Sequence, residues 1–220
     1  MSGTWLGDWA DQLPVLLAGL WTSLLLTALS LLVGVPLSLL LALLASARRA
    51  IVRLPAIGLV EFGRGVPALV MLQFVYFGLP QLKVSLESFT AAVAGLSYVA
   101  AAYMSEIVRA GLRSVPAGQS EAARASGLGR MDEFRFIILP QAMRIALPPL
   151  LNFAIVVFQA SSLAFAVAVP EMLSKAYELG SASFRHLEVL SLAGVLYAAI
   201  VIPAAFAVRV LERRLSRFSA

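Results

Sequence analysis

The sequence predicts an all-α membrane protein with five transmembrane helices, and three observations support this. Of the 220 residues, 60% are hydrophobic and 13% are charged, and the mean hydropathy is +0.90. Soluble domains carry about 25% charged residues, so a soluble fold of this size could not cover so much apolar surface. Five apolar segments are also long enough to cross a bilayer, and most charged residues lie between them. We therefore expect a lipid bilayer around the chain.

The apolar segments follow one another with short connections. A spanning helix needs about 20 apolar residues to cross about 30 Å of hydrocarbon. The segments that meet this length are residues 18–45, 56–79, 89–108, 145–169 and 189–208. Within the first, Gly34 and Pro36 predict a bend. Trp5 and Trp9, four residues apart, suit a short helix at the membrane interface before it.

Small residues in the third segment predict close packing between helices. Ala91 and Gly95, and likewise Ser97, Ala101 and Ser105, recur at four-residue spacing. Such spacing places small side chains on one face and lets a neighbouring helix approach.

The distribution of basic residues predicts the orientation. If five helices alternate, 14 of the 17 Lys and Arg residues fall on one side of the membrane, and Lys83, Lys175 and Arg185 fall on the other. Basic residues accumulate on the cytoplasmic side of membrane proteins. We therefore expect the N-terminus outside and the C-terminus in the cytoplasm, with residues 1–220 forming a single membrane domain.

One polar block, residues 114–140, separates the third and fourth segments and reads SVPAGQSEAARASGLGRMDEFRFIILP. The alanine-rich stretch after Pro116 predicts a short helix, because proline is tolerated in a first helical turn. Gly127 and Gly129 predict a tight turn, followed by a second helix. Pro140 is expected to bend the chain towards the fourth segment.

Within this block the residue spacing is specific. It reads E-A-A, three positions, G, nine positions and I-x-L-P, and this spacing resembles the EAA signature loop of the membrane subunits of ATP-binding-cassette (ABC) importers. The stretches EFGRGVPALVMLQFVYFGLP, AAYMSEIVRAGLRSVPAGQSEAA and ILPQAMRIALPPLLN are similar to the polar-amino-acid uptake permeases of the histidine, glutamine and glutamate type. The resemblance covers about residues 18–210.

The resemblance implies the transmembrane domain of a type I ABC importer in the bacterial cytoplasmic (inner) membrane. In that family the polar block is a coupling helix that docks on a separate ATPase, and the matching residues here are Glu121, Ala122, Ala123, Gly127, Leu139 and Pro140. The implied partners are an ABC ATPase dimer, a second permease subunit of the same or a related kind, and an extracytoplasmic amino-acid-binding protein. Mg-ATP would be held by the ATPase, so no cofactor is expected in this chain.

Other function classes fit the sequence poorly. No G-x-x-x-x-G-K-[ST] loop occurs, so the chain is not expected to hydrolyse ATP. Glu61 and Glu106 are each followed three residues later by an arginine, Arg64 and Arg109, which indicates structural pairs rather than a proton relay. Cysteine is absent and His186 is the single histidine, so neither thiol chemistry nor a histidine metal site is expected. The basic residues indicate membrane topology rather than nucleic-acid binding.

The fourth segment is the candidate for substrate contact. It carries no charge, but it holds the polar residues Asn152, Gln159, Ser161 and Ser162. Polar side chains in a membrane face either a cavity or another helix, and a hydrogen bond between helices is the more common role for each. Members of the family commonly show a Lys-Asp-Thr-Ser-Leu-like stretch here, where this chain has QASSL, with Gln159 and Ala160 in place of the charged pair. No metal site is expected.

A second departure points the same way, because the family's R-G-T-P-L-L-V-Q stands here as RGVPALVM. Two hypotheses follow: either the substrate is not cationic, or this subunit is the less engaged half of a heterodimer. An importer for another small solute, such as an opine or an amino-acid derivative, remains the alternative. A non-ABC channel or scaffold and an intramembrane enzyme are the further rivals, and the enzyme would lack obvious catalytic groups.

Overall fold

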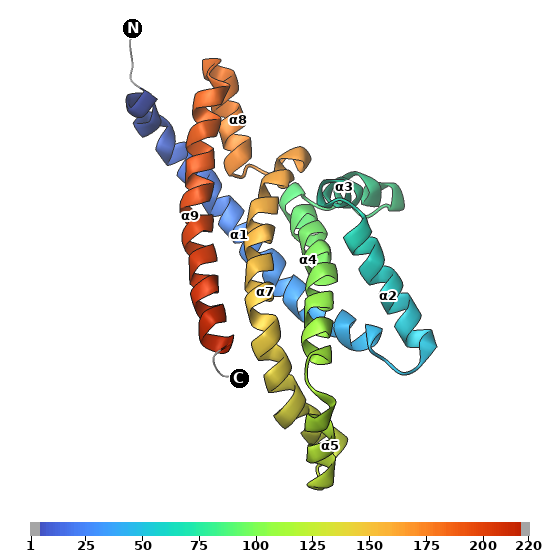
Figure 1. Cartoon of the computed structure of the whole chain (residues 1–220). Helices are drawn as coiled ribbons and strands as arrows, with labels where there is room; N and C mark the ends of the chain where they lie inside the picture. The colour runs from blue at the N-terminus through green and yellow to red at the C-terminus, as the bar shows by residue number, and fades with distance from the viewer. Residues whose placement is uncertain (1–4, 217–220) are drawn as a thin grey trace.

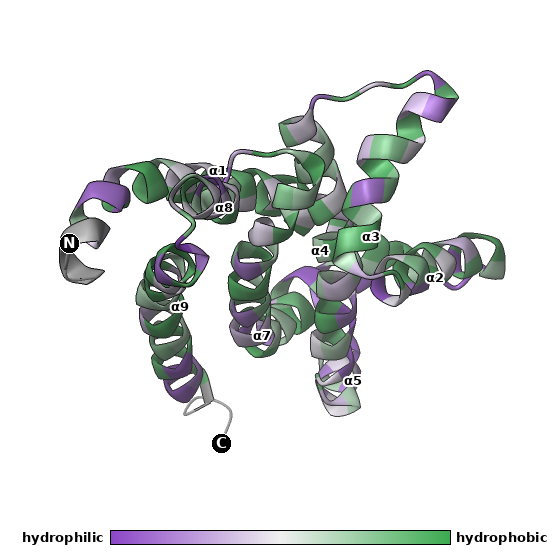
Figure 2. Cartoon of the chain, turned by 90° about the horizontal axis from the view of Figure 1, so that it is seen from above, coloured by the Kyte–Doolittle hydropathy of each residue, from purple (hydrophilic) through white to green (hydrophobic). Residues whose placement is uncertain are grey.

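The computed structural model describes residues 5–216, and every regular element within that range is helical (Figure 1). Hydrophobic residues dominate the long helices, whereas polar residues are frequent in the short helix α5 (Figure 2). In the described range four helices are long and apolar enough to cross a membrane, and a bent pair of shorter helices makes up to a fifth. The long helices are α1 (Trp5–Ala45), α4 (Ser88–Arg113), α7 (Leu139–Ala160) and α9 (His186–Ser216). The all-α prediction is confirmed.

Helix α1 is a single helix of 41 residues, roughly 60 Å long at 1.5 Å per residue. It lies obliquely behind α7 and α4 (Figure 1). The expected separate interfacial helix is therefore wrong, and α1 continues through Gly34 and Pro36. Gly34 has a packing role instead: a Cβ there would lie 3.1 Å from the Ser97 carbonyl oxygen of α4. The glycine therefore lets two helices approach closely.

The predicted second segment is not one continuous helix, and that prediction is wrong. Helix α2 (Ala50–Gly65) is followed by α3 (Ala68–Gln73), and the two directions differ by 108°. The chain then continues in a π-helical turn (Phe74–Gly78) and a 3-10 turn (Leu79–Leu82). At the break Val66 is extended, with φ −90° and ψ 128°. The residue before a proline avoids the helical region, and Pro67 has no N–H to continue the helix.

Helix α4 lies at the centre and packs against α1, α2, α3 and α7. The small residues predicted to allow close packing are all buried, namely Ala91, Gly95, Ser97, Ala101 and Ser105. A matching glycine stands on α2, where a Cβ at Gly63 would lie 2.7 Å from the Cβ of Ala102. Close approach of α4 to its neighbours therefore depends on small side chains from both partners.

A substitution at Gly111 tests this packing. A Cβ at Gly111 would lie 2.8 Å from the Ala142 carbonyl oxygen and 2.9 Å from the Ala146 Cβ, both on α7. We expect Gly111→Ala to lower the melting temperature of the purified protein, because overpacking costs about 1–3 kcal/mol.

The matched control is Gly58→Ala on α2, where a Cβ would meet no atom of the described chain within 4 Å. Alanine is better than glycine in an exposed helix by about 1 kcal/mol, so this variant should melt at the same or a higher temperature. Equal melting temperatures for the two variants would show that α4 and α7 are not in tight contact there.

The last two elements complete the bundle. Helix α8 (Met172–Ser183) is too short to cross a membrane and packs against α1 and α9. One core cluster joins α1 to this pair through Leu16, Ala176, Val189 and Leu192. Helix α1 begins at one end of the bundle, and α9 finishes towards the other end. Helix α5 lies at the same end as the last residues of α9 (Figure 1).

Candidate functional site

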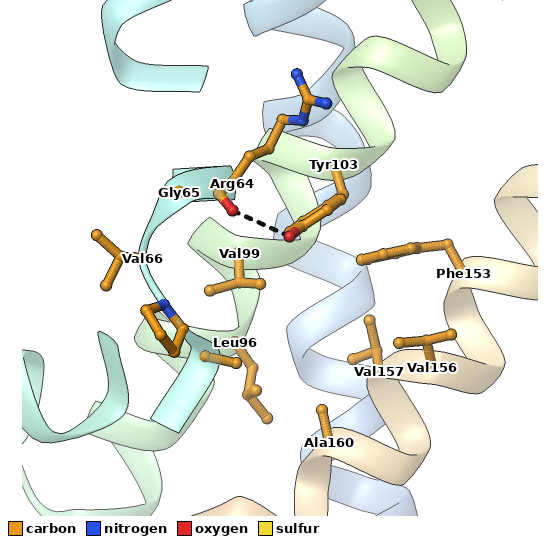
Figure 3. Close-up of a pocket in the computed structure, with 12 residues that line it drawn as sticks. Arg64, Gly65, Val66, Leu96, Val99, Tyr103, Phe153, Val156, Val157 and Ala160 are labelled. Atoms are coloured by element: carbon orange, nitrogen blue, oxygen red, sulfur yellow. Dashed lines mark hydrogen bonds between the residues drawn. The ribbon is translucent and has the colours of Figure 1, made fainter. Parts of the chain in front are cut away.

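A cavity of about 500 Å³ lies between the α2–α3 break, α4 and α7 (Figure 3). Three groups of residues line it: Arg64, Gly65, Val66, Pro67 and Ala68 at the break, Leu96, Val99 and Tyr103 on α4, and Phe153, Val156, Val157 and Ala160 on α7. The broken helix thus supplies one whole wall. Non-helical backbone is tolerated at membrane depth where it lines a cavity.

Aromatic residues organise one end of the cavity. The Tyr103 hydroxyl donates a hydrogen bond to the Arg64 carbonyl oxygen at 3.0 Å (Figure 3). This satisfies one of the carbonyls left without a partner where α2 ends. The Tyr103 ring also stacks on the Phe153 ring, with centroids 5.1 Å apart. Tyr103 therefore holds the α2 end and α7 at fixed positions on either side of α4.

The walls are mainly apolar, with a single charged side chain at the rim. Arg64 donates from Nη1 to the Glu61 carboxylate at 3.0 Å, and its guanidinium is directed away from Leu96 and Val99 (Figure 3). Its Nε is buried and has no hydrogen-bond partner within the described chain. Among the described residues that line the cavity there is no aspartate or glutamate. The site can thus hold an apolar group, with one cationic side chain at its rim.

The four predicted substrate residues do not line this cavity. Asn152 and Gln159 are exposed on another face of α7. Ser161 is buried and donates to the Phe158 carbonyl at 2.7 Å, while Ser162 donates to the Gln159 carbonyl at 2.8 Å. The two hydroxyls therefore serve their own helix. The adjacent position of the QASSL stretch, Ala160, does lie in the cavity wall.

The polar block forms a second candidate site at the end of the bundle. Helix α5 (Ala117–Ala125) is followed by α6 (Arg130–Asp132), a π-helical turn (Glu133–Ile138) and then α7. The predicted short helix, turn and second helix are confirmed. Pro140 does not end the helix, because Arg130–Val167 forms one helical stretch. The Leu139 N–H bonds to the Phe134 carbonyl, five residues back, so the wider turn absorbs the proline.

The turn after α5 has a defined geometry. Gly127 has φ +79°, a left-handed conformation that glycine adopts without strain. The Leu128 N–H donates to the Ala123 carbonyl at 3.1 Å, and the Gly127 N–H donates to the Arg124 carbonyl at 3.0 Å. These two bonds form a Schellman motif, which satisfies the last carbonyls of α5. The glycine predicted to end the helix does so.

An ion pair joins the two halves of the block. Arg124 Nε donates to Glu133 Oε2 at 3.1 Å, and the Glu133 side chain is almost fully buried. Within α5 the side chain of Ala123 is buried, whereas Glu121 and Ala122 are exposed on the outer face of the helix. Among the other predicted coupling residues, Leu139 is half-buried and Pro140 is exposed. The turn and the ion pair therefore hold α5 in a fixed position, with its outer face exposed.

The sequence interpretation missed one buried acid, Glu171. Its carboxylate is 0% exposed and accepts four hydrogen bonds. Two come from the α8 backbone, from Leu173 N–H at 2.9 Å and Ser174 N–H at 2.7 Å. The others come from the hydroxyls of Ser23 on α1, at 3.3 Å, and Tyr197 on α9, at 3.2 Å. An acid directly before a helix is a capping signal, and the Pro-Glu pair before α8 carried it.

No group of three or more His, Asp or Glu side chains within residues 5–216 is arranged to hold a metal ion. The central cavity offers room for a small solute, and α5 offers a surface for another protein.

Comparison with known proteins gives consistent results. Residues 34–217 match the family model of the binding-protein-dependent transport system inner membrane component. The chain is 38% identical over 208 residues to YckA of Bacillus subtilis, a probable amino-acid ABC transporter permease protein, covering 94% of this chain and 92% of the relative. It is 34% identical over 217 residues to the glutamine transport system permease protein GlnP of Escherichia coli, covering 98% and 99%. It is 40% identical over 191 residues to the octopine transport system permease protein OccM of Rhizobium meliloti, covering 83% and 78%.

Solved structures give the same result. The crystal structure of an amino acid ABC transporter with histidines contains a chain that matches with a TM-score of 0.91 and 31% identity, covering 97% of this chain and 100% of that one. An inward-facing structure of the MetNI methionine ABC transporter matches with a TM-score of 0.73 at 23% identity, covering 91% of this chain and 96% of that one, which supports the fold alone.

Proposed function

Because the chain belongs to the family of inner membrane components of binding-protein-dependent transport systems, we propose that it is the transmembrane subunit of an ATP-driven importer of polar amino acids. Its relatives are permease subunits of amino-acid ABC transporters. The outward presentation of α5 supports the proposal most strongly. A short helix held beyond the bundle by a Schellman turn and an ion pair is suited to receive movement from another protein.

The orientation follows from charge. Helix α5 and the end of α9 lie at the same end of the bundle (Figure 1), and both the polar block and the last turns of α9 are rich in arginine. Basic residues favour the cytoplasmic side, so this end faces the cytoplasm of a bacterium and the start of α1 faces outside. An ATPase dimer then meets α5 in the cytoplasm, and an extracytoplasmic binding protein delivers substrate at the other end.

Energy enters through the partner. A thousandfold gradient of a neutral solute costs about 4 kcal/mol, which the ATPase supplies from Mg-ATP. Its contacts fall on Glu121 and Ala122, the exposed residues of α5. Movement of α5 passes through the Arg124–Glu133 pair to the helical stretch that continues as α7. Because α7 lines the central cavity, the cavity wall moves with the polar block. We call this block, residues 114–140, the coupling block.

A second permease subunit, the same or related, covers the outer face of α7. Asn152 and Gln159 are exposed there in the part of α7 after Arg144, which carries no charge, and their seven-residue spacing puts them on one face. Polar side chains at membrane depth face protein or water rather than lipid. These two residues therefore face the partner subunit or the path between the subunits.

The lining of the cavity favours a substrate without positive charge. Within the described lining there is no carboxylate to pair with a cationic side chain, and the one charged residue, Arg64, stands at the rim. A substrate carboxylate fits that end, and a neutral side chain fits the apolar walls. An opine or other amino-acid derivative is the second candidate, because the octopine permease is among the relatives. Ligand screening of the associated binding protein separates the two.

Co-purification from the native host tests the proposal directly. We expect an ABC ATPase and a second permease subunit to co-purify with the chain, and mass spectrometry identifies them. Reconstitution with the binding protein should then give uptake that depends on ATP. A chain that purifies without an ATPase, or that conducts solute without ATP, would support the channel or scaffold instead.

A large residue at Ala160 tests the cavity as the transport path. We expect Ala160→Trp to reduce reconstituted uptake at least about tenfold, because the indole fills space that a substrate needs. The control is Ile202→Trp on α9, whose side chain is exposed to the membrane, and it should transport normally. ATPase activity of both assemblies confirms that the subunits are joined. Normal uptake by Ala160→Trp would place the path elsewhere.

A further inference from the structure

A second pocket, of about 260 Å³, lies between the loop after α1 and the coupling block. Its lining combines charge with apolar surface and comprises Arg48, Arg124, Arg130, Glu133, Phe134 and Ile138. The transport cycle described above uses the Arg124–Glu133 pair of this lining, but neither Arg48 nor Arg130. The pocket bridges two parts of the chain that are far apart in sequence.

The charge in this pocket is not balanced. The lining holds three guanidinium groups and one carboxylate, and Arg124 forms a salt bridge with that carboxylate at 3.1 Å. Arg48 and Arg130 form no salt bridge with any residue in the range 5–216. Two arginines thus remain available for an anion, and guanidinium groups bind phosphate oxygens in a bidentate manner.

The depth of the pocket indicates the source of that anion. Arg48 lies three residues beyond the last residue of α1, and Ile138 directly precedes α7. The pocket therefore lies beside the ends of two helical stretches that are long and apolar enough to span a membrane. Beside it, the start of α2 exposes Ile51 by 83% and Leu54 by 61%, as expected of a surface that rests in lipid. An ATPase bound to the outer face of α5 lies further out.

We infer that this pocket binds an anionic phospholipid, with the phosphate between Arg48 and Arg130 and the acyl chains against Phe134 and Ile138. The lipid ties the α1–α2 loop to the coupling block, so the block depends on membrane composition for its position. Basic pockets near helix ends are suited to anionic headgroups, and long apolar chains favour the adjoining surface.

Lipid binding by the intact transporter complex tests this inference. The probe is phosphatidylglycerol in nanodiscs of phosphatidylcholine, with retained lipid measured by native mass spectrometry and the melting temperature measured against phosphatidylglycerol content. We expect Arg48→Gln with Arg130→Gln to lower phosphatidylglycerol retention about tenfold and to flatten the melting response. The double variant Arg48→Lys with Arg130→Lys should keep most of the phosphatidylglycerol retention and most of the melting response, because both positive charges remain.

The control removes equal charge elsewhere, through Arg209→Gln with Arg214→Gln at the end of α9, and it should behave like the unchanged protein. An unaltered lipid response in the Arg48 and Arg130 glutamine variant would overturn the inference. So would inorganic phosphate in detergent that reproduces the stabilisation, since the site would then hold a free anion. Loss of ATPase binding with an unaltered lipid response would assign the two arginines to that protein and likewise overturn it.

Discussion

Gly127→Val is expected to reduce coupled uptake at least about tenfold, while the membrane bundle stays folded. Gly127 holds φ +79° in the Schellman turn that ends α5. A β-branched residue in that conformation costs about 1–3 kcal/mol, which favours a different path for the turn. A Cβ at this position would meet no atom of the described chain within 4 Å, so the effect comes from the backbone and not from a clash.

The matched variant is Gly127→Asn, because asparagine adopts the left-handed conformation far more readily than valine. We expect it to retain most of the uptake. Reconstituted uptake and ATPase activity are measured together, so that loss of coupling is distinguished from loss of assembly. If the valine variant transports as well as the asparagine variant, the turn does not transmit movement to α7.

Glu171→Ala is expected to destabilise the whole bundle. Removal of the carboxylate leaves the Tyr197 hydroxyl and two backbone N–H groups of α8 without their acceptor, whereas the Ser23 hydroxyl can still donate to the Gly19 carbonyl at 3.3 Å. Each buried group without a partner costs about 1–3 kcal/mol, so a loss of about 3 kcal/mol or more is expected. In a chain of this length that corresponds to roughly 10 °C in melting temperature. Thermal unfolding of the purified protein in detergent measures it.

Two controls separate this network from general effects. Glu171→Gln keeps the volume and one acceptor oxygen, so it should lose less stability than alanine. Glu178→Ala removes an acid from the same helix, but Glu178 is exposed and pairs with Lys175 at 2.7 Å. Exposed ion pairs contribute about 0–1 kcal/mol, so this variant should melt close to the unchanged protein. Similar melting temperatures for Glu171→Ala and Glu178→Ala would argue against the network.

The all-α class and the helix, turn and second helix of the coupling block could be predicted from the sequence, because both depend on local properties of the chain. Length and apolarity determine which segments can span a bilayer. The alanine-rich stretch before Gly127 ends where a left-handed residue is needed, and the structure has that turn. The small residues of α4 also indicated a buried face, although the sequence could not say which helices would occupy it.

Proline shows where the sequence was insufficient. Pro14, Pro36, Pro55 and Pro203 all lie inside helices, whereas Pro67 follows a break of 108°. The residue type alone therefore does not decide the outcome. At the break the Arg64 carbonyl receives a hydrogen bond from Tyr103, which stands on a helix 39 residues further along the chain.

The sequence by itself determined the helical class, the approximate bounds of the four long apolar helices, and the turn at Gly127. The tertiary structure decided where α2 breaks, which face of α7 lines the cavity, and how Glu171 joins three helices. The physical reason is the range of the interactions involved. Hydrophobicity and backbone preference act within a few residues, whereas a cavity wall or a buried carboxylate is defined by partners that only packing brings together.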